Sequence, residues 1–195
     1  MAFTIDESLV VPDYPIWRIS VEQYHEMIES GILTEDDPVE LLEGWLVTKM
    51  PKTPRHSFST QQTRETLTGI VPSGWYVDSQ EPITTADSEP EPDIIVVRGS
   101  PRDYSEHPTA KDIALVVEVT DATLQRDRTL KLRVYASAGI AVYCILNLLE
   151  RQLEVYGEPE GATYRQRRDY AATETVPVVI GGQEVGRVTV RELLA

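Results

Sequence analysis

Two carboxylates in this sequence occur within or beside apolar runs, and their positions are the first to suggest chemistry. Glu118 interrupts the run LVVEV, and Asp93 opens the run DIIVV directly after a proline. A carboxylate buried in a strand costs free energy unless hydrogen bonds or a cation meet it. Two carboxylates on neighbouring strands could converge on one divalent cation, because such ions prefer hard oxygen ligands.

A lysine in the segment that follows Glu118 is the expected partner of that carboxylate. Residues 124–138 have helical periodicity, and at about 100° per residue most of the apolar side chains fall on one broad arc. Asp127 and Lys131 lie near the middle of this arc, where solvated charges do not belong. We therefore expect Lys131 to face the sheet and meet Glu118. A metal ion, the lysine, or both would then stabilise the carboxylate.

The same pair also has a purely structural interpretation. Buried ion pairs occur without catalysis, and they shift pKa values as active sites do. For Glu118 and Lys131 taken alone, the structural and functional interpretations carry equal weight. Asp93 favours a functional site, because three polar groups on apolar elements would then converge.

The elements that must position these residues alternate between helices and strands, which predicts the α/β class. Residues 113–148 are typical of a strand, a helix and a second strand, and such a unit favours a parallel pair with a right-handed crossover. A strand pair is expected to turn near Glu43 and Gly44, and short strands or hairpins are expected after about residue 150.

Two further helices are expected upstream. The first covers about 20–30, with Ser20 as the N-cap, Gln23 completing a capping box and Gly31 ending the helix. The second begins after two prolines near residue 54 and runs to about Ile70.

Composition limits the classes of protein that this chain can represent. Its 195 residues are 41% hydrophobic, as in globular proteins, and its net charge is −14. That charge argues against non-specific nucleic-acid binding, although a local basic face remains compatible with it. Basic residues cluster in two places, at Arg126, Arg128, Lys131 and Arg133, and at Arg165, Arg167 and Arg168.

The single cysteine and the lack of long apolar stretches bear on the compartment. Cys144 lies in an apolar run and cannot form an internal disulfide, so we expect a buried, inert thiol in a reducing compartment. No stretch approaches the roughly 18 apolar residues of a membrane span, and the stretch MAFTIDESLV has no cationic start. We therefore expect a soluble, cytoplasmic protein.

Several motifs, taken in order, resemble one protein family. They are PVELLEG, a histidine that opens a helix (His56), PEPDIIVV, LVVEVTDATLQRDRTLKLRVYASAGIAVYCIL and RQLEVY. Together they resemble the Uma-type family of candidate endonucleases, a branch of the PD-(D/E)XK restriction-endonuclease-like superfamily. The resemblance runs from about Ile19 to Leu194, and its specific part is Glu91 to Tyr143.

The resemblance implies a fold and a domain organisation. It implies a restriction-endonuclease-like mixed central sheet flanked by helices, with additional N-terminal and C-terminal β-hairpins. Residues 1–195 would form one domain. Within it, the core would span about 36–156, the N-terminal helix about 20–30 and the C-terminal hairpins about 150–195.

The resemblance also implies roles for individual residues. Asp93 and Glu118 match the acidic positions of the motif and would bind Mg²⁺ or Mn²⁺. Thr120 stands where the superfamily carries its lysine, and Lys131 on the following helix fits the displaced lysine of the Uma-type branch.

Three further residues are candidates with roles left open. Glu40 would be another metal ligand, or it would contact the ligands without binding the metal itself. His56 would act in the site or only form a local hydrogen bond at the start of its helix. Asp127 would orient Lys131 or serve as a simple partner one turn away.

Three functions compete at this point. The first is a metal-dependent endonuclease that hydrolyses DNA, in which a homodimer is expected from family analogy because cutting both strands needs two sites. The second is a nucleic-acid-binding or regulatory protein with the nuclease fold and little activity. The third is a phosphodiesterase that acts on a small nucleotide.

Overall fold

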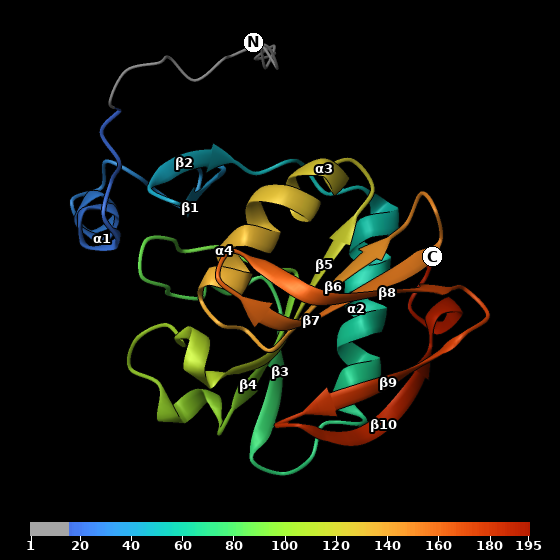
Figure 1. Cartoon of the computed structure of the whole chain (residues 1–195). Coiled ribbons are helices and arrows are strands. Elements are labelled where there is room, and N and C mark those ends of the chain that lie inside the picture. Colours follow the sequence, from blue (N-terminus) through green and yellow to red (C-terminus); the bar gives the residue numbers. More distant parts are fainter. Residues whose placement is uncertain (1–15) are drawn as a thin grey trace.

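A six-stranded sheet forms the centre of the molecule (Figure 1). The computed structural model describes residues 16–195, so the expectations for residues 1–15 lie outside the described part. The strand order is β3-β4-β5-β6-β7-β8. The strands are β3 (Trp75–Asp78), β4 (Ile94–Arg98), β5 (Ile113–Thr120), β6 (Val142–Asn147), β7 (Gln152–Glu160) and β8 (Thr163–Ala171).

The parallel pair expected in residues 113–148 is present. β5 and β6 pair in parallel, whereas each other neighbouring pair of this sheet is antiparallel. All eight residues of β5 are buried, as expected for a strand covered on both faces. This burial explains why the apolar run around Glu118 does not simply alternate with polar residues.

Two small hairpins lie outside the central sheet. The first joins β1 (Val39–Leu42) to β2 (Trp45–Thr48), and the second joins β9 (Thr175–Ile180) to β10 (Gln183–Thr189). The predicted turn at Glu43 and Gly44 is confirmed, with φ angles of 49° and 77°. The strands expected after about residue 150 are present: β7 and β8 form an antiparallel pair that extends the central sheet, and β9–β10 forms a separate hairpin.

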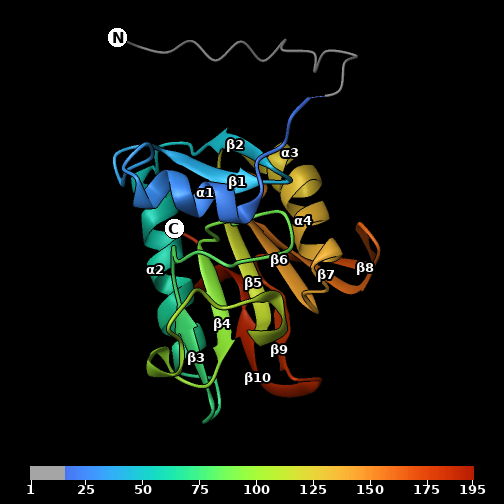
Figure 2. The ribbon, with the colours of Figure 1, turned by 90° about the vertical axis from the view of Figure 1, so that its left-hand side faces the viewer.

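Helices cover both faces of the sheet (Figure 2). α1 is Val21–Glu29 and has the predicted capping box of Ser20 and Gln23, and α2 is Pro54–Thr68. The helix expected over 124–138 is divided into α3 (Leu124–Arg126), a π-helical turn (Asp127–Lys131) and α4 (Leu132–Ser137). Such turns insert an extra residue into a helix and occur often at functional sites. Short 3₁₀ turns cover Pro101–Asp103, Ala110–Asp112 and Val190–Glu192.

The two faces of β5 contribute to two separate apolar cores. Leu115, Val117 and Val119 pack in a core with α2 and the β9–β10 hairpin. Val116 faces the other core, which contains α4 and a group of buried tyrosines. Side chains alternate along a strand, so Glu118 points to the same side as Val116 and α4. The predicted α/β fold class, a mixed central sheet flanked by helices with extra hairpins, is confirmed. Among the described residues, none of the helices has the length and apolar character needed to cross a bilayer.

Candidate active site

Glu118 and Lys131 form the buried ion pair that the sequence predicts. Lys131 Nζ lies 2.9 Å from Glu118 Oε1 and 3.3 Å from Glu40 Oε2. The three side chains are nearly inaccessible to solvent. Tyr135, one turn beyond Lys131, donates a 2.6 Å hydrogen bond to the same Oε1 atom of Glu118. The π-helical turn and α4 therefore hold one oxygen of this carboxylate from two positions.

Asp93 lies beside Glu118 because of the strand register. β4 and β5 pair with Ile94 opposite Val117, and the same register carried one residue further sets Asp93 opposite Glu118. Opposed residues of an antiparallel pair project to the same face of a sheet. Asp93 Oδ2 accepts a 2.9 Å hydrogen bond from the backbone N–H of Val119 and lies 3.1 Å from Nε2 of His56.

His56 thus makes both of the contacts that the sequence left open. Its backbone N–H donates to the hydroxyl of Thr53, the N-cap of α2, while its ring faces Asp93. Burial acts to lower the pKa of His56, but the hydrogen bond and charge of Asp93 outweigh it, and the pKa lies above its usual value. The imidazole therefore tends toward the charged form beside Asp93.

Asp93 and Glu118 line one cavity of about 80 Å³, as the expectation of a shared site requires. Glu40, His56, Asp127 and Lys131 line it as well. Two carboxyl groups that bind one ion must lie within about 5 Å of each other, and we predict this separation for Asp93 and Glu118.

Burial and like charges dominate the electrostatics of this cavity. Burial raises the pKa of Glu118 to about 8, with further contributions from Asp93, Asp127 and Glu40, while Lys131 opposes the shift. Burial alone would lower the pKa of Lys131, but the carboxylates around it, Glu118 first, hold the pKa above its usual range. Lys131 is therefore an ammonium at neutral pH and is unsuited to act as a general base.

The free carboxylate oxygens decide whether a metal ion fits. Within the described residues, neither Glu118 Oε2 nor Asp93 Oδ1 accepts a hydrogen bond, and neither is shut off from solvent. No three His, Cys, Asp or Glu side chains of residues 16–195 are grouped as a complete cage for an ion. Mg²⁺ is commonly held by one or two carboxylates, with water or phosphate oxygens at its other positions. The donor set therefore fits a hard divalent ion that shares its coordination with substrate.

Comparison with known proteins identifies the family of this chain and a solved structure of similar fold. Residues 21–189 match the Uma2 family, which is described as "Putative restriction endonuclease". The chain belongs to the Uma2 family. A crystal structure of a putative nuclease belonging to DUF820, from Anabaena variabilis, is similar in fold with a TM-score of 0.66 and 17% sequence identity. The similarity covers 90% of this chain and 97% of that chain. A search of curated proteins gave no match.

Two candidate residues of this Uma2 chain stand beside the ion pair without bonding to the lysine. Thr120 is buried, and its hydroxyl shares a 3.1 Å hydrogen bond with that of Thr123. Asp127 accepts from the same Thr123 hydroxyl at 2.8 Å, and burial raises its pKa. Asp127 thus acts on Lys131 through its charge. Thr120 places a hydroxyl at the position where the resemblance described above expects a lysine.

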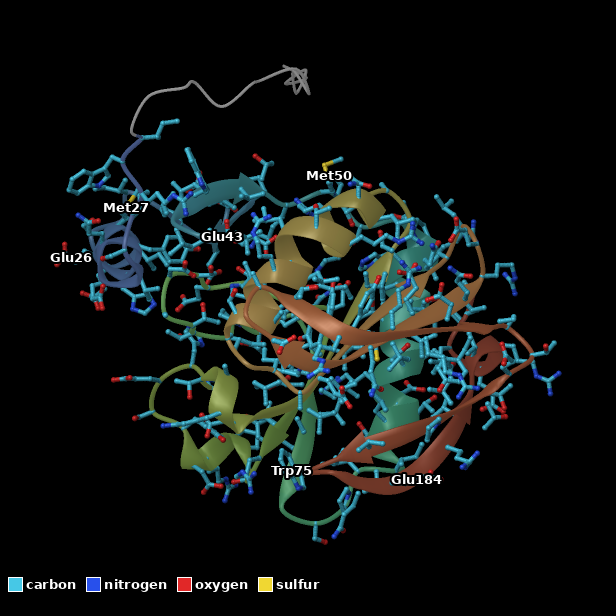
Figure 3. All side chains as sticks on the ribbon, in the orientation of Figure 1. Glu26, Met27, Glu43, Met50, Trp75 and Glu184 are labelled. Atoms are coloured by element: carbon cyan, nitrogen blue, oxygen red, sulfur yellow. The ribbon has the colours of Figure 1, made fainter. Side chains whose placement is uncertain are left out.

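The basic residues of the two sequence clusters lie in different parts of the structure. Arg126 lines the cavity, but Arg128 is paired with buried Glu154 at 2.6 Å, and Arg133 is paired with Glu43, which is labelled in Figure 3. Arg165, Arg167 and Arg168 contribute to the lining of a different cavity across the sheet, although the guanidinium of Arg167 itself lies against Glu154. Of the arginines in the two basic clusters, Arg126 is the one that lines this cavity among the described residues. The pairing register of a strand fixes the face of the sheet to which each of its side chains points.

Several residues that line the cavity were not predicted from the sequence. Lys49 and Lys52 line the cavity together with Met50, which is labelled in Figure 3. Lys49 and Lys52 follow β2, between the motif PVELLEG and His56, but no periodicity in this stretch identifies them. Tyr135 could have been found, because it follows Lys131 by four residues and so shares its helix face.

Proposed function

We propose that this chain is a divalent-metal-dependent endonuclease that hydrolyses phosphodiester bonds of DNA. The observation that carries the proposal is the register that sets Asp93 opposite Glu118, with Lys131 over the second carboxylate. Membership of a family of candidate restriction endonucleases supports it.

Each residue has a defined task in this proposal. Asp93 and Glu118 would hold Mg²⁺ or Mn²⁺, which when bound would polarise the scissile phosphate and supply a nucleophilic hydroxide. Lys131 and Tyr135 orient Glu118 by binding one of its oxygens and leaving the other free. His56 orients Asp93 in the same way. The ammonium of Lys131 also stabilises negative charge that grows on the phosphoryl oxygens.

The small volume of the cavity favours a polymeric substrate. Sites that enclose whole small molecules have volumes of about 300–1,000 Å³. The cavity of about 80 Å³ has room for a phosphate group but not for a nucleotide. Sugar and base would remain outside, as they do when a protein contacts the backbone of a nucleic acid. This observation argues against the phosphodiesterase alternative.

Metal removal is the first test of the proposed reaction. Purified chain should nick supercoiled plasmid when Mg²⁺ or Mn²⁺ is supplied, and EDTA should abolish nicking, because the carboxylates alone cannot activate water at neutral pH. The measurement is the conversion of supercoiled to open-circular DNA on a gel. Glu118→Gln, purified in parallel, is the control for contaminating nucleases.

The alternatives predict other outcomes of the same assay. Equal nicking by Glu118→Gln would assign the activity to a contaminant. DNA binding without nicking under either ion would favour the nucleic-acid-binding protein with a silent site. Direct formation of linear plasmid would support a homodimer with two active sites, which we propose as the assembly that cuts both strands.

Arg126 is the residue that we expect to contact the DNA backbone beside the scissile bond. Its Nη1 atom donates to the carbonyl of Thr48 at 2.8 Å, and its Nε is the one buried side-chain polar atom without a partner among the described residues. A buried donor without a partner destabilises the protein, and a hydrogen bond to a ligand oxygen would remove this penalty. Arg126 lines the cavity, so a phosphate there is a suitable partner.

Arg126→Gln should weaken DNA binding about tenfold and reduce the slope of log affinity against log salt by about one, as loss of one phosphate contact does. Fluorescence anisotropy with labelled duplex at several salt concentrations measures both quantities. Arg133→Gln is the matched control, because Arg133 belongs to the following helix and is already paired with Glu43. Equal losses in the two variants would indicate only a general charge effect.

A further inference from the structure

A second, much larger cavity lies between the central sheet and the β9–β10 hairpin. Its volume is about 680 Å³, and Leu115 and Val117 of β5 line it on the face of the sheet opposite to Glu118. Val155 of β7 and Val178 of β9 contribute to its apolar walls. This volume falls within the range of about 300–1,000 Å³ that holds small organic molecules in proteins.

The charges that line this cavity are all positive. The charged residues that contribute to its lining are Arg165, Arg167 and Arg168, and within the described residues no aspartate or glutamate does. The guanidinium of Arg167 turns to the other face of the sheet, where it contacts Glu154 and the ring of Tyr156. The whole chain carries a net charge of −14, so an apolar cavity bordered by arginines alone is distinct from the rest of the surface. Such a boundary complements an anion and disfavours a cation.

One of the three arginines is available to a ligand. Arg167 is paired with Asp169 at 2.8 Å and with Glu154 at 3.3 Å, and Arg165 lies 3.8 Å from Glu160. Arg168 has no carboxylate partner within the described residues, and its guanidinium lies 4.5 Å from the ring centre of Tyr170. A stacked guanidinium is held in place and keeps its hydrogen-bond donors for a carboxylate.

We propose that this cavity binds an amphipathic carboxylate, with its alkyl chain between the sheet and the hairpin and its head group at Arg168. A single available guanidinium matches a head group with one negative charge. The apolar walls remove the chain from water, which supplies most of the binding free energy. The site lies across the sheet from Asp93 and Glu118, so this proposal does not depend on the proposed nuclease activity.

Calorimetric titration with decanoate, below the concentration at which it forms micelles, tests the proposal. One molecule should bind per chain with saturation, and affinity should rise about fourfold for each added methylene from hexanoate to decanoate. Decanol should bind about tenfold more weakly, because it lacks the charge that Arg168 recognises. Decylamine should not bind. The absence of saturable decanoate binding, or equal binding of decylamine, would overturn the proposal.

Two variants locate the binding site. Gly157 lines the cavity, and a side chain added there would meet no atom within 4 Å of its Cβ, so Gly157→Phe should fill the cavity without strain and abolish decanoate binding. Arg168→Gln should weaken decanoate binding about tenfold and leave decanol binding unchanged. Arg187→Gln is the control, because Arg187 is paired with Glu184, which is labelled on the hairpin in Figure 3, and does not line the cavity.

The single cysteine supplies an independent readout. Cys144 lines the same cavity, and burial raises the pKa of its thiol to about 12. Bound decanoate should slow alkylation of Cys144 by a small neutral reagent at alkaline pH, measured by mass spectrometry. Binding that neither protects Cys144 nor responds to Arg168→Gln would place the ligand elsewhere and refute the assignment.

Discussion

Lys131→Met is expected to reduce plasmid nicking by orders of magnitude and to lower the free energy of unfolding by about 3–5 kcal/mol. The variant keeps much of the volume of the lysine stem and removes the ammonium. Glu118 and Glu40, which lie 2.9 Å and 3.3 Å from Lys131 Nζ, would then remain buried without their cation. Nicking assays at a temperature where the variant is folded, together with denaturant unfolding, measure the two effects.

A double variant separates the structural contribution of Lys131 from the catalytic one. Lys131→Met combined with Glu118→Gln should recover part of the lost stability, because a neutral amide replaces the unpaired carboxylate, but it should recover no activity. Lys49→Met is the control: the Lys49–Glu91 pair borders the same cavity but is partly exposed, so its loss should cost about 1 kcal/mol or less. Wild-type activity together with wild-type stability in Lys131→Met would contradict both roles.

Asp93→Asn is expected to abolish metal binding and nicking without loss of stability in the absence of metal. The amide oxygen can still accept from the N–H of Val119, so the backbone contact is kept. In the wild type, the negative charge of Asp93 is one of the causes that raise the pKa of Glu118. The substitution removes this charge and so relieves the repulsion between the two carboxylates. Mutation of a residue that only hydrogen-bonds to a metal ligand typically lowers metal affinity about 10–100-fold, and loss of a ligand itself should lower it by more.

Calorimetry with Mn²⁺ and thermal unfolding of the metal-free chain provide the two measurements. Glu91→Gln is the matched control, because Glu91 lines the same cavity but is bound by Lys49 at 2.8 and 2.9 Å. It should keep metal affinity within a few-fold of the wild type. If Asp93→Asn bound Mn²⁺ as tightly as the wild type, Asp93 would not be a ligand, and the proposed chemistry would need another site.

The buried positions of Asp93, Glu118 and Lys131 can be predicted from the sequence because they depend on local patterns. A continuous apolar run marks β5 and a helical period marks residues 124–138. Side chains alternate along a strand, so both the strand face of Glu118 and the helix face of Lys131 follow from neighbouring residues. The capping box of α1 and the turn at Glu43 and Gly44 are equally local. Such features are encoded within a few residues, so side-chain chemistry specifies them directly.

Tertiary structure alone decided which distant residues complete the site. The contact of His56 with Asp93, and the approach of Lys49, Lys52 and Arg126 to the cavity, join segments that no periodicity relates. The sequence likewise could not show that β8 extends the central sheet, which places Arg168 at the cavity across the sheet from Glu118 and Arg167 against Glu154. Strand order and register arise from packing of the whole core, and a change of face moves a charge from one cavity to the other. The local pattern therefore determined where the carboxylates and their lysine are buried, and the packing of the sheet determined which charges surround them.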